Sequence, residues 1–598
     1  MSFHLRPLGL LAALALAAPA AAQLGIDLNA DERAKEEQQR KDRQEKRRPE
    51  AKPAPRPQAP VTMPGLDIGA PGARKGEAAQ RIALANQVFK RGDFEEAALA
   101  FDAILRDPGL PEAHDEARYQ LAKSLYRLEL YHSSLAQLDQ ILQRGPQGTK
   151  YFHNALEWLF QVGKKTVNEA VIVNQVARYA NGALPPSSQD AFTYLLARYS
   201  YERGHALSEA GQQAEARRAY DEAHRLAGQV RLEAGSRAAS GQGDDPGATE
   251  GDLHAKARFL EGLVQYAQGN GAAAVESFKD VVRLTNPKRG RAPDLRLREL
   301  SFLQLARIHY EHKQNRYAIF YYDKMPWGGE SWLEGLWEAS YAHYRVGDYE
   351  KTLGNLLTLQ SPYFRDEWFP ESWILKAIVY YENCRYPEAR AILDEFHGAY
   401  EGVHAELDRL TTERTTPTAL FDLLDETQKG RGAGARPVLR RVLKVAFTDR
   451  DVKRLDDSIL EVEKELDVGL GERRAAFRGS ALAKDLRAQL AAERKRLVEE
   501  AGARTRAKLE YERDGLRELL QQALRIKIEV ARKEREALEG ALTRGGQVDV
   551  LRDYRFSSAV SDEHLYWPYD GEFWRDELGT YTYTMTKGCR DTTARAAR

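Results

Sequence analysis

The chain has 598 residues, of which 42% are hydrophobic and 30% are charged, with 89 basic and 89 acidic side chains. This length exceeds that of one compact domain and supplies apolar residues for several cores. The balanced charge gives no support for nucleic-acid binding, which needs a basic surface. We therefore predict several structural units with much solvated helix and without a nucleic-acid partner.

The first residues predict the compartment. His4 and Arg6 precede an apolar run from Leu8 to Ala18, which is followed by Ala20-Ala21-Ala22. This order is typical of a cleaved secretory signal peptide, here residues 1–22. The run is shorter than the roughly 20 apolar residues of a permanent membrane span. We expect a periplasmic protein without a membrane span after cleavage.

Residues 23–75 are charged at first and then rich in proline, with seven prolines from Pro49 to Pro71. Such a segment buries too little apolar surface to offset the entropy of ordering it. We predict a disordered linker, which serves either as a tether or as a passive leader.

A pattern of helical hairpins occupies residues 76–402. In each unit an apolar helical run ends in a tight turn, and a second helix carries a small or branched residue and then larger apolar ones on one face. Tyr349 and Tyr386 of two successive units lie 37 residues apart, a spacing typical of stacked hairpins. The turns are Gly92-Asp93-Phe94, Glu129-Leu130-Tyr131, Gly211-Gln212-Gln213, Gly269-Asn270-Gly271, Lys313-Gln314-Asn315, Gly347-Asp348-Tyr349 and Cys384-Arg385-Tyr386. The apolar faces that follow them are Ala97, Phe101 and Ile104; Ser134, Leu138 and Ile141; Ala216, Tyr220 and Ala223; Ala274, Phe278 and Val281; Ala318, Tyr322 and Met325; Thr352, Leu356 and Leu359; and Ala389, Leu393 and Phe396.

These units resemble tetratricopeptide repeats, in which small residues lie where two helices touch. One hairpin cannot bury its apolar face alone, so stacking of neighbours closes the core. Residues 146–190 lack a clean repeat, and we interpret them as degenerate units. The composition of residues 234–251 predicts a surface loop. The fold class that follows is all-α, with a tetratricopeptide-like solenoid.

Charged helical segments follow the repeats. We expect a helical connector over residues 403–472. Residues 473–545 are rich in Ala, Leu, Glu, Lys and Arg, which predicts one or two long helices, with coiled-coil packing against an unidentified partner. Oligomerisation through this segment stays open. Its apolar stripe at i, i+4 spacing comprises Leu516, Leu520, Leu524 and Ile528.

Residues 546–598 form an aromatic-rich tail, in which Thr580 to Thr586 alternates as a strand does. So many rings either pack back onto the chain or insert into a partner, and we favour the first. Cys384 and Cys589 are the only cysteines. In an oxidising compartment they could pair, and two unpaired thiols are the alternative, because a cysteine count does not fix connectivity.

The sequence contains no GK[ST], HExxH or GxSxG motif. His309 and His312 lie three residues apart, but a third metal ligand at a suitable spacing is missing. Surface histidines are the better interpretation. We predict a non-enzymatic protein without a cofactor or a metal.

The strongest binding candidate is a concave groove, which the first helix of each hairpin lines in tetratricopeptide domains. Aromatic and arginine side chains anchor protein interfaces, and such a groove takes an extended or helical peptide. The alternative is that several of the aromatic residues pack between units. Alignment of three units on their turns places these residues on the groove: Arg307, Tyr310, Glu311, Trp337, Tyr341, Tyr344, Arg345, Ile378, Tyr381 and Glu382.

Together, the signal peptide, the repeats, the charged helices and the tail sequence YWPYDGEFWRDELG (Tyr566 to Gly579) resemble one family. It is the periplasmic tetratricopeptide proteins of the myxobacterial adventurous gliding-motility (Glt) machinery, and its GltC-like members in particular. The resemblance implies a non-enzymatic part of an envelope assembly, with periplasmic or outer-membrane protein partners. The alternatives are a peptidoglycan- or division-linked coordinator and an envelope enzyme that docks substrates on its repeats.

Overall fold

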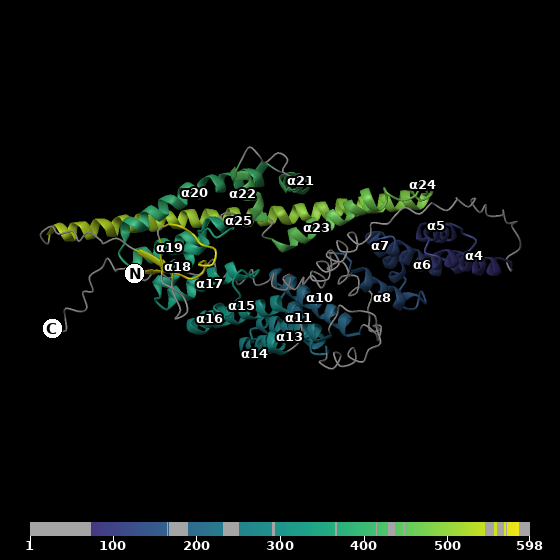
Figure 1. Cartoon of the computed structure of the whole chain (residues 1–598), viewed down its shortest axis with the longest axis horizontal. Coiled ribbons are helices and arrows are strands. Elements are labelled where there is room, and N and C mark those ends of the chain that lie inside the picture. The colour runs from purple at the N-terminus through teal and green to yellow at the C-terminus, as the bar shows by residue number, and fades with distance from the viewer. Residues whose placement is uncertain are drawn as a thin grey trace, which may run out of the picture.

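The computed structural model describes residues 73–163, 165–166, 189–230, 250–289, 294–364, 367–413, 416–428, 437–446, 449–543, 555–558, 567–569 and 571–584. The expected signal peptide, and the expected linker up to residue 72, lie outside these residues. The described part is a helical array with one small sheet (Figure 1). The predicted fold class, an all-α helical solenoid, is confirmed.

Seven helical hairpins follow one another in the described residues. The first helix begins at Ala73, three residues before the predicted start of the array. α8 (Phe152–Gly163) lies between the second and third hairpins, and α13 includes the last two residues of the loop that we expected at 234–251. The hairpins are α4 (Ala73–Lys90) with α5 (Phe94–Leu105), α6 (His114–Arg127) with α7 (Tyr131–Leu142), α10 (Gln189–Glu209) with α11 (Gln213–Ala227), α13 (Glu250–Ala267) with α14 (Gly271–Leu284), α15 (Leu295–Glu311) with α16 (Asn315–Tyr322), α17 (Trp332–Arg345) with α18 (Tyr349–Leu359), and α19 (Glu371–Glu382) with α20 (Tyr386–Glu413).

The turn within each hairpin lies where the sequence predicts it. In all seven described hairpins the second helix begins at the third residue of the predicted turn. The middle residue is the N-cap, and Asp93, Asn270 and Asp348 accept a hydrogen bond from the helix through their side chains. The first residue is left-handed in every case, a conformation that suits glycine best. These first residues are Gly92, Glu129, Gly211, Gly269, Lys313, Gly347 and Cys384.

The predicted apolar faces form the core of the array. All of the residues predicted to follow the turns are buried, and the most exposed of them, Met325, is only 7% exposed. Phe101, Phe278 and Phe396 are completely buried. Small residues such as Ala97 lie beside them, because two helices approach closely there. Stacked hairpins therefore share a continuous core.

A C-terminal return, which we define as residues 417–543, follows the last hairpin. α20 continues to Glu413, past residue 402 where we expected the array to end. The return consists of α21 (Pro417–Gln428), α22 (Pro437–Ala446), α23 (Arg450–Lys464), a π-helical turn η6 (Glu465–Gly469), α24 (Ala475–Arg478) and α25 (Ala481–Thr543). α25 is one unbroken helix of 63 residues, which corresponds to a length of about 95 Å.

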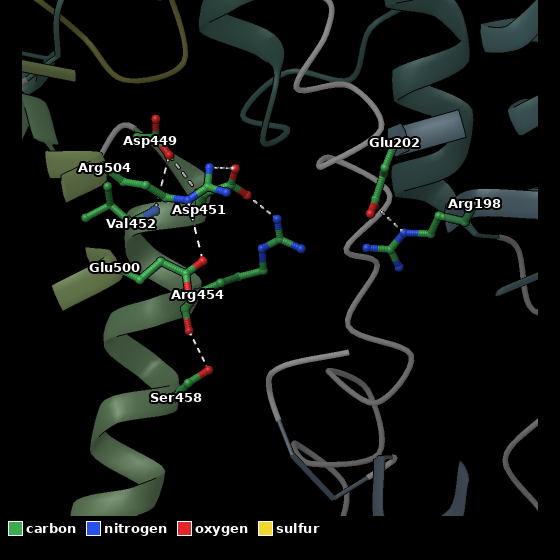
Figure 2. Close-up of polar contacts among 9 residues, drawn as sticks. All are labelled: Arg198, Glu202, Asp449, Asp451, Val452, Arg454, Ser458, Glu500 and Arg504. Atoms are coloured by element: carbon green, nitrogen blue, oxygen red, sulfur yellow. Dashed lines mark hydrogen bonds and ion pairs between the residues drawn. The ribbon is translucent and has the colours of Figure 1, made fainter. Parts of the chain in front are cut away.

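α25 runs antiparallel to α20. Arg390 Nη1 lies 2.9 Å from Glu534 Oε2 near one end of α20, and Arg513 Nη1 donates to Thr411 Oγ1 near the other, at 3.0 Å. α23 also packs on α25, where Arg504 Nη1 lies 2.7 Å from Asp451 Oδ2 (Figure 2). Within the described residues, α25 therefore packs on helices of its own chain, and these are at least part of the packing partner that the sequence left unidentified.

The residues that α25 buries differ from the predicted stripe. Of that stripe Leu516 is buried, whereas Leu524 and Ile528 are 53% and 64% exposed. A four-residue step advances about 40° around a helix, so such a stripe drifts off the contact, whereas a seven-residue step drifts by only about 20°. In this part of α25 the buried residues Leu509, Leu516, Ala523 and Val530 recur every seven positions, and Ile526 is buried beside them.

The return reaches the first two hairpins through a segment that we call the clasp, residues 465–485. The Glu465 carboxylate accepts hydrogen bonds from the backbone N–H groups of His132 and Ser133, both at 2.9 Å. It thereby caps α7, whose own N-cap residue, Leu130, makes no side-chain capping bond. Arg106 Nη2 lies 2.6 Å from Asp485 Oδ2. α4, α5 and α6, the last hairpin and α25 share one core cluster, and Figure 1 shows α25 running from the last hairpin to α24, beside α5.

The tail packs on α18. Its strands β1 (Arg555–Ser558), β2 (Trp567–Tyr569) and β3 (Tyr581–Thr584) form an antiparallel sheet in the order β2-β1-β3. β3 lies within the predicted alternating segment. The backbone N–H of Gly579 donates to Thr358 Oγ1 at 2.9 Å. A Cβ on Gly354 would lie 1.8 Å from the Tyr581 carbonyl oxygen, so only glycine admits the strand here.

Cys384 is disulfide-bonded. Cys589, the other cysteine of the chain, lies outside the described residues, so the predicted pairing of the two stays a prediction. Tyr583 of β3 contacts Tyr380 with ring centroids 6.0 Å apart, which brings the tail close to the turn that contains Cys384.

Candidate protein-binding face

The predicted groove residues occupy equivalent positions on three neighbouring first helices. Tyr310 of α15, Tyr344 of α17 and Tyr381 of α19 each lie three residues before the left-handed turn residue. α13 carries Tyr266 at the same position, although our alignment of three units did not include it. A column of tyrosines therefore crosses four hairpins.

Three tyrosines of this column, Tyr266, Tyr310 and Tyr344, each meet a charged residue of the next hairpin, and we call the arrangement the tyrosine ladder. Tyr266 OH donates to Glu311 Oε2 at 2.8 Å, and Tyr344 OH donates to Glu382 Oε1 at 2.8 Å. Burial raises the pKa of Tyr310, and the neighbouring Arg345 lowers it. These contacts set the register between hairpins, so they favour the alternative that several groove residues pack between units.

Arg307 belongs to the interior and not to the groove. It is 3% exposed and forms a buried ion pair with Glu338 of the next hairpin, with Nε 3.0 Å from both carboxylate oxygens. Tyr322 OH also donates to Glu338, at 2.9 Å. Although burial lowers the pKa of Arg307, the charges of Glu338 and Glu334 outweigh it, so the net shift is upward. Our expectation of an accessible arginine here was wrong, because an alignment on turns does not show how deeply a residue lies.

Two other predicted groove residues are buried; of the remaining seven, the three charged residues are exposed and the four aromatic residues are partly buried. Tyr310 and Ile378 are each 8% exposed. Trp337 packs edge-to-face on Tyr341 with ring centroids 4.8 Å apart, which fixes both rings. We call the remaining seven residues the concave face; it comprises Glu311, Trp337, Tyr341, Tyr344, Arg345, Tyr381 and Glu382.

α25 borders one end of the concave face. Burial raises the pKa of Tyr381, and Glu529 of α25 raises it further. Trp368 Nε1 donates to Glu512 Oε2 at 2.7 Å, and burial raises the pKa of the nearby Glu371 to about 7. The sequence did not predict these contacts, because nothing in the composition of α25 identifies the hairpin on which it packs.

A second aromatic feature recurs across the turns. The ring three residues before the left-handed residue contacts the ring that begins the second helix, as in Tyr344 with Tyr349 at 6.0 Å. The other such pairs are Phe89 with Phe94, Tyr126 with Tyr131, and Tyr381 with Tyr386. The predicted turns already contained the second ring of each pair, and the pairing itself could have been found by reading three residues upstream.

The two histidines considered as metal ligands have separate partners. His309 stacks on Tyr321 with centroids 5.4 Å apart and lies 2.6 Å from Gln314 Oε1, whereas His312 Nδ1 lies 2.8 Å from the carbonyl oxygen of Ile308. Within the described ranges there is no group of three or more His, Cys, Asp or Glu residues placed to hold a metal ion. Across those same ranges, no helix combines the length and apolar character that crossing a bilayer requires.

Comparison with known proteins gives little guidance. No protein-family model and no curated protein matches the chain. Among solved structures, the chain is similar to a "Circular tandem repeat protein with novel repeat topology and enhanced subunit contact surfaces". The two are 14% identical, the match covers 80% of this chain and 99% of that chain, and the TM-score is 0.17.

Proposed function

We propose that the protein is a non-enzymatic scaffold whose concave face binds an extended or helical segment of another envelope protein. Stacked helical hairpins typically bind other proteins through such extended concave surfaces. The observation that carries the proposal is the row of partly exposed rings at Trp337, Tyr341, Tyr344 and Tyr381, which pack against the core on one side. Large rigid rings dominate the energy of protein interfaces.

The contacts beneath these rings support a binding role. Trp337 and Tyr341 brace each other, and Tyr344 is held by Glu382. Side chains that are fixed before binding lose little conformational entropy when a partner arrives. Exposed charges of both signs, Glu311, Arg345 and Glu382, follow the rings along the face. They suit a partner segment with charges of both signs rather than a uniformly charged one.

We further propose a cellular compartment and an assembly for this scaffold. The signal-peptide pattern of residues 1–22 supports export to the periplasm. The resemblance of the tail to the Glt proteins supports a role in a gliding-motility complex of the envelope. The partners would then be periplasmic or outer-membrane proteins.

Photo-crosslinking from the concave face tests the proposal. The triple variant Trp337→Ala, Tyr341→Ala, Tyr344→Ala should lose about tenfold or more of the partner captured by the exported protein. Tyr344→Phe keeps the ring but removes its bond to Glu382, so it should weaken capture of the partner far less than the triple variant does. Tyr317→Ala, a residue 63% exposed on α16, controls for loss of an exposed ring elsewhere. If the triple variant has a native circular dichroism spectrum and still captures every partner, binding at the concave face is refuted.

A further inference from the structure

A second aromatic surface lies where the tail docks on the array. Trp327, Tyr363 and Trp574 are 54%, 55% and 58% exposed. Tyr363 OH donates to the carbonyl oxygen of Phe573 at 3.4 Å, and Trp327 Nε1 donates to that of Leu578 at 2.9 Å. Trp327 and Tyr363 of the array therefore hold one docked segment, to which Trp574 itself belongs. Soluble proteins seldom expose several large rings together unless the rings contact a partner.

The base under these rings is packed. Leu357 of α18 and Leu578 and Tyr581 of the tail are buried together, with Trp332 and Phe573 partly buried against them. Trp327 contacts Trp332 at 5.8 Å between ring centroids. The exposed rings consequently stand on a fixed support, which lowers the entropy that binding costs.

The docked segment is acidic. Residues 571–580 contain Glu572, Asp576 and Glu577 against Arg575, and Lys351 of α18 donates to the Gly579 carbonyl oxygen at 2.8 Å, so a net negative charge remains after both cations are counted. Burial raises the pKa of Glu577, the hydroxyl of Tyr581, which donates to Glu577 Oε2 at 3.3 Å, lowers it, and the charges of Asp576 and Glu572 raise it further, so the net shift is upward. The carboxylates are therefore close enough to repel one another, and an approaching cation would relieve that repulsion.

We propose that these residues, which we call the tail patch, bind a basic segment of a partner protein. Lysine or arginine side chains would lie on the rings of Trp327, Tyr363 and Trp574, with their charges directed toward Glu572, Asp576 and Glu577. Aromatic faces attract such cations, and carboxylates form charge-assisted hydrogen bonds with them. The negative charge disfavours nucleic acid and anionic lipid surfaces. The tail patch shares no residue with the concave face.

Fluorescence anisotropy with the full chain and a labelled peptide of alternating arginine and serine tests this inference. We expect a Kd in the micromolar range, weakened about tenfold or more by Trp574→Ala. The double variant Glu572→Gln, Asp576→Asn keeps every ring and should weaken binding by a similar factor.

Two controls separate the tail patch from other surfaces. Tyr511→Ala removes a ring that is 47% exposed on α25 and should leave peptide binding unchanged, as should the triple variant of the concave face. Equal affinity for a peptide of alternating glutamate and serine would overturn the proposal. So would full binding by Trp574→Ala, since charge alone would then account for the interaction.

Discussion

The hairpins at the ends of the array and those in its middle share the same turn but have different support. The cores of α10, α11, α13 and α14 contain residues from neighbouring hairpins alone. The cores of α4–α6 and of α18–α20 also include residues of the return, and Arg106 pairs with Asp485, 379 positions away. The middle thus follows the nearest-neighbour rule of repeat proteins, whereas the return couples the two ends.

The turns differ in the same way. The ring pair across the turn occurs in the first two and last two described hairpins, whereas the three middle ones begin their second helix with Gln213, Gly271 and Asn315. Bulky rings are therefore placed at the turns of hairpins near the ends of the array. Four substitutions test how far this division extends.

The largest effect is expected from Phe278→Ala in the middle. Its side chain is completely buried, so truncation should cost about 3–5 kcal/mol. Hydrogen exchange should show lost protection in α13–α15 and unchanged protection in α25. The matched variant Phe101→Ala in the first hairpin should instead also deprotect α24 and the start of α25. Deprotection of α25 by Phe278→Ala would contradict the division.

Glu465→Ala should open the clasp. It leaves the N–H groups of His132 and Ser133 without their acceptor, at a cost of about 2–3 kcal/mol. Urea unfolding measures the loss, and hydrogen exchange should locate it at the start of α7. The two N–H groups donate to different oxygens of Glu465, so Glu465→Gln keeps one acceptor, sets its NH2 against the other N–H, and should lose at least half as much; an unchanged stability of Glu465→Gln would contradict the capping role.

Glu371→Gln should change how stability depends on pH. Burial raises the pKa of Glu371 from 4.5 to about 7. Between these values the folded chain keeps a proton that the unfolded chain has released, so stability falls as pH rises through this interval. The variant should match the wild type at pH 4 and exceed it by about 1–2 kcal/mol at pH 8, allowing for partial solvent screening. Urea unfolding at both pH values tests this, and parallel pH profiles would contradict it.

Lys313→Gly should give the smallest effect, a stabilisation of about 0.5–1 kcal/mol, because Lys313 has a left-handed φ of 60°. Gly347, with a φ of 78°, occupies the equivalent turn position, so Gly347→Ala should destabilise by about 1 kcal/mol. Shifts of the same sign in urea midpoint would show that backbone strain does not govern this position.

Local pattern predicted the array well and its long-range contacts poorly. The turns and buried faces follow from residues within one hairpin, so Gly347 and Leu356 could be placed from sequence. The depth of Arg307 depends on Glu338 of the next hairpin, which an alignment of single units does not reveal. The buried residues of α25 were not predicted, because Ala523 is less hydrophobic than the neighbouring Leu524, which the sequence pattern favoured.

The position of the tail was harder to predict than that of the hairpins. Its aromatic content predicted that it would be buried. Its position, however, depends on Gly354, and a glycine within a helix does not by itself predict that a strand will pack there. The concave face was predicted as a surface, whereas the tyrosine ladder within it required the spacing between hairpins.

The clasp has a consequence for the order of events as the chain folds. Asp93 and Leu128 obtain their partners from Arg474 and Arg473, so the first two hairpins to be synthesised complete their core only when the return arrives. The middle hairpins need only their neighbours and are free to fold earlier. Contacts so distant in sequence form slowly, and until they form, the apolar surface near α5 and α7 is open to aggregation. A chain interrupted before residue 465 would keep that vulnerability permanently.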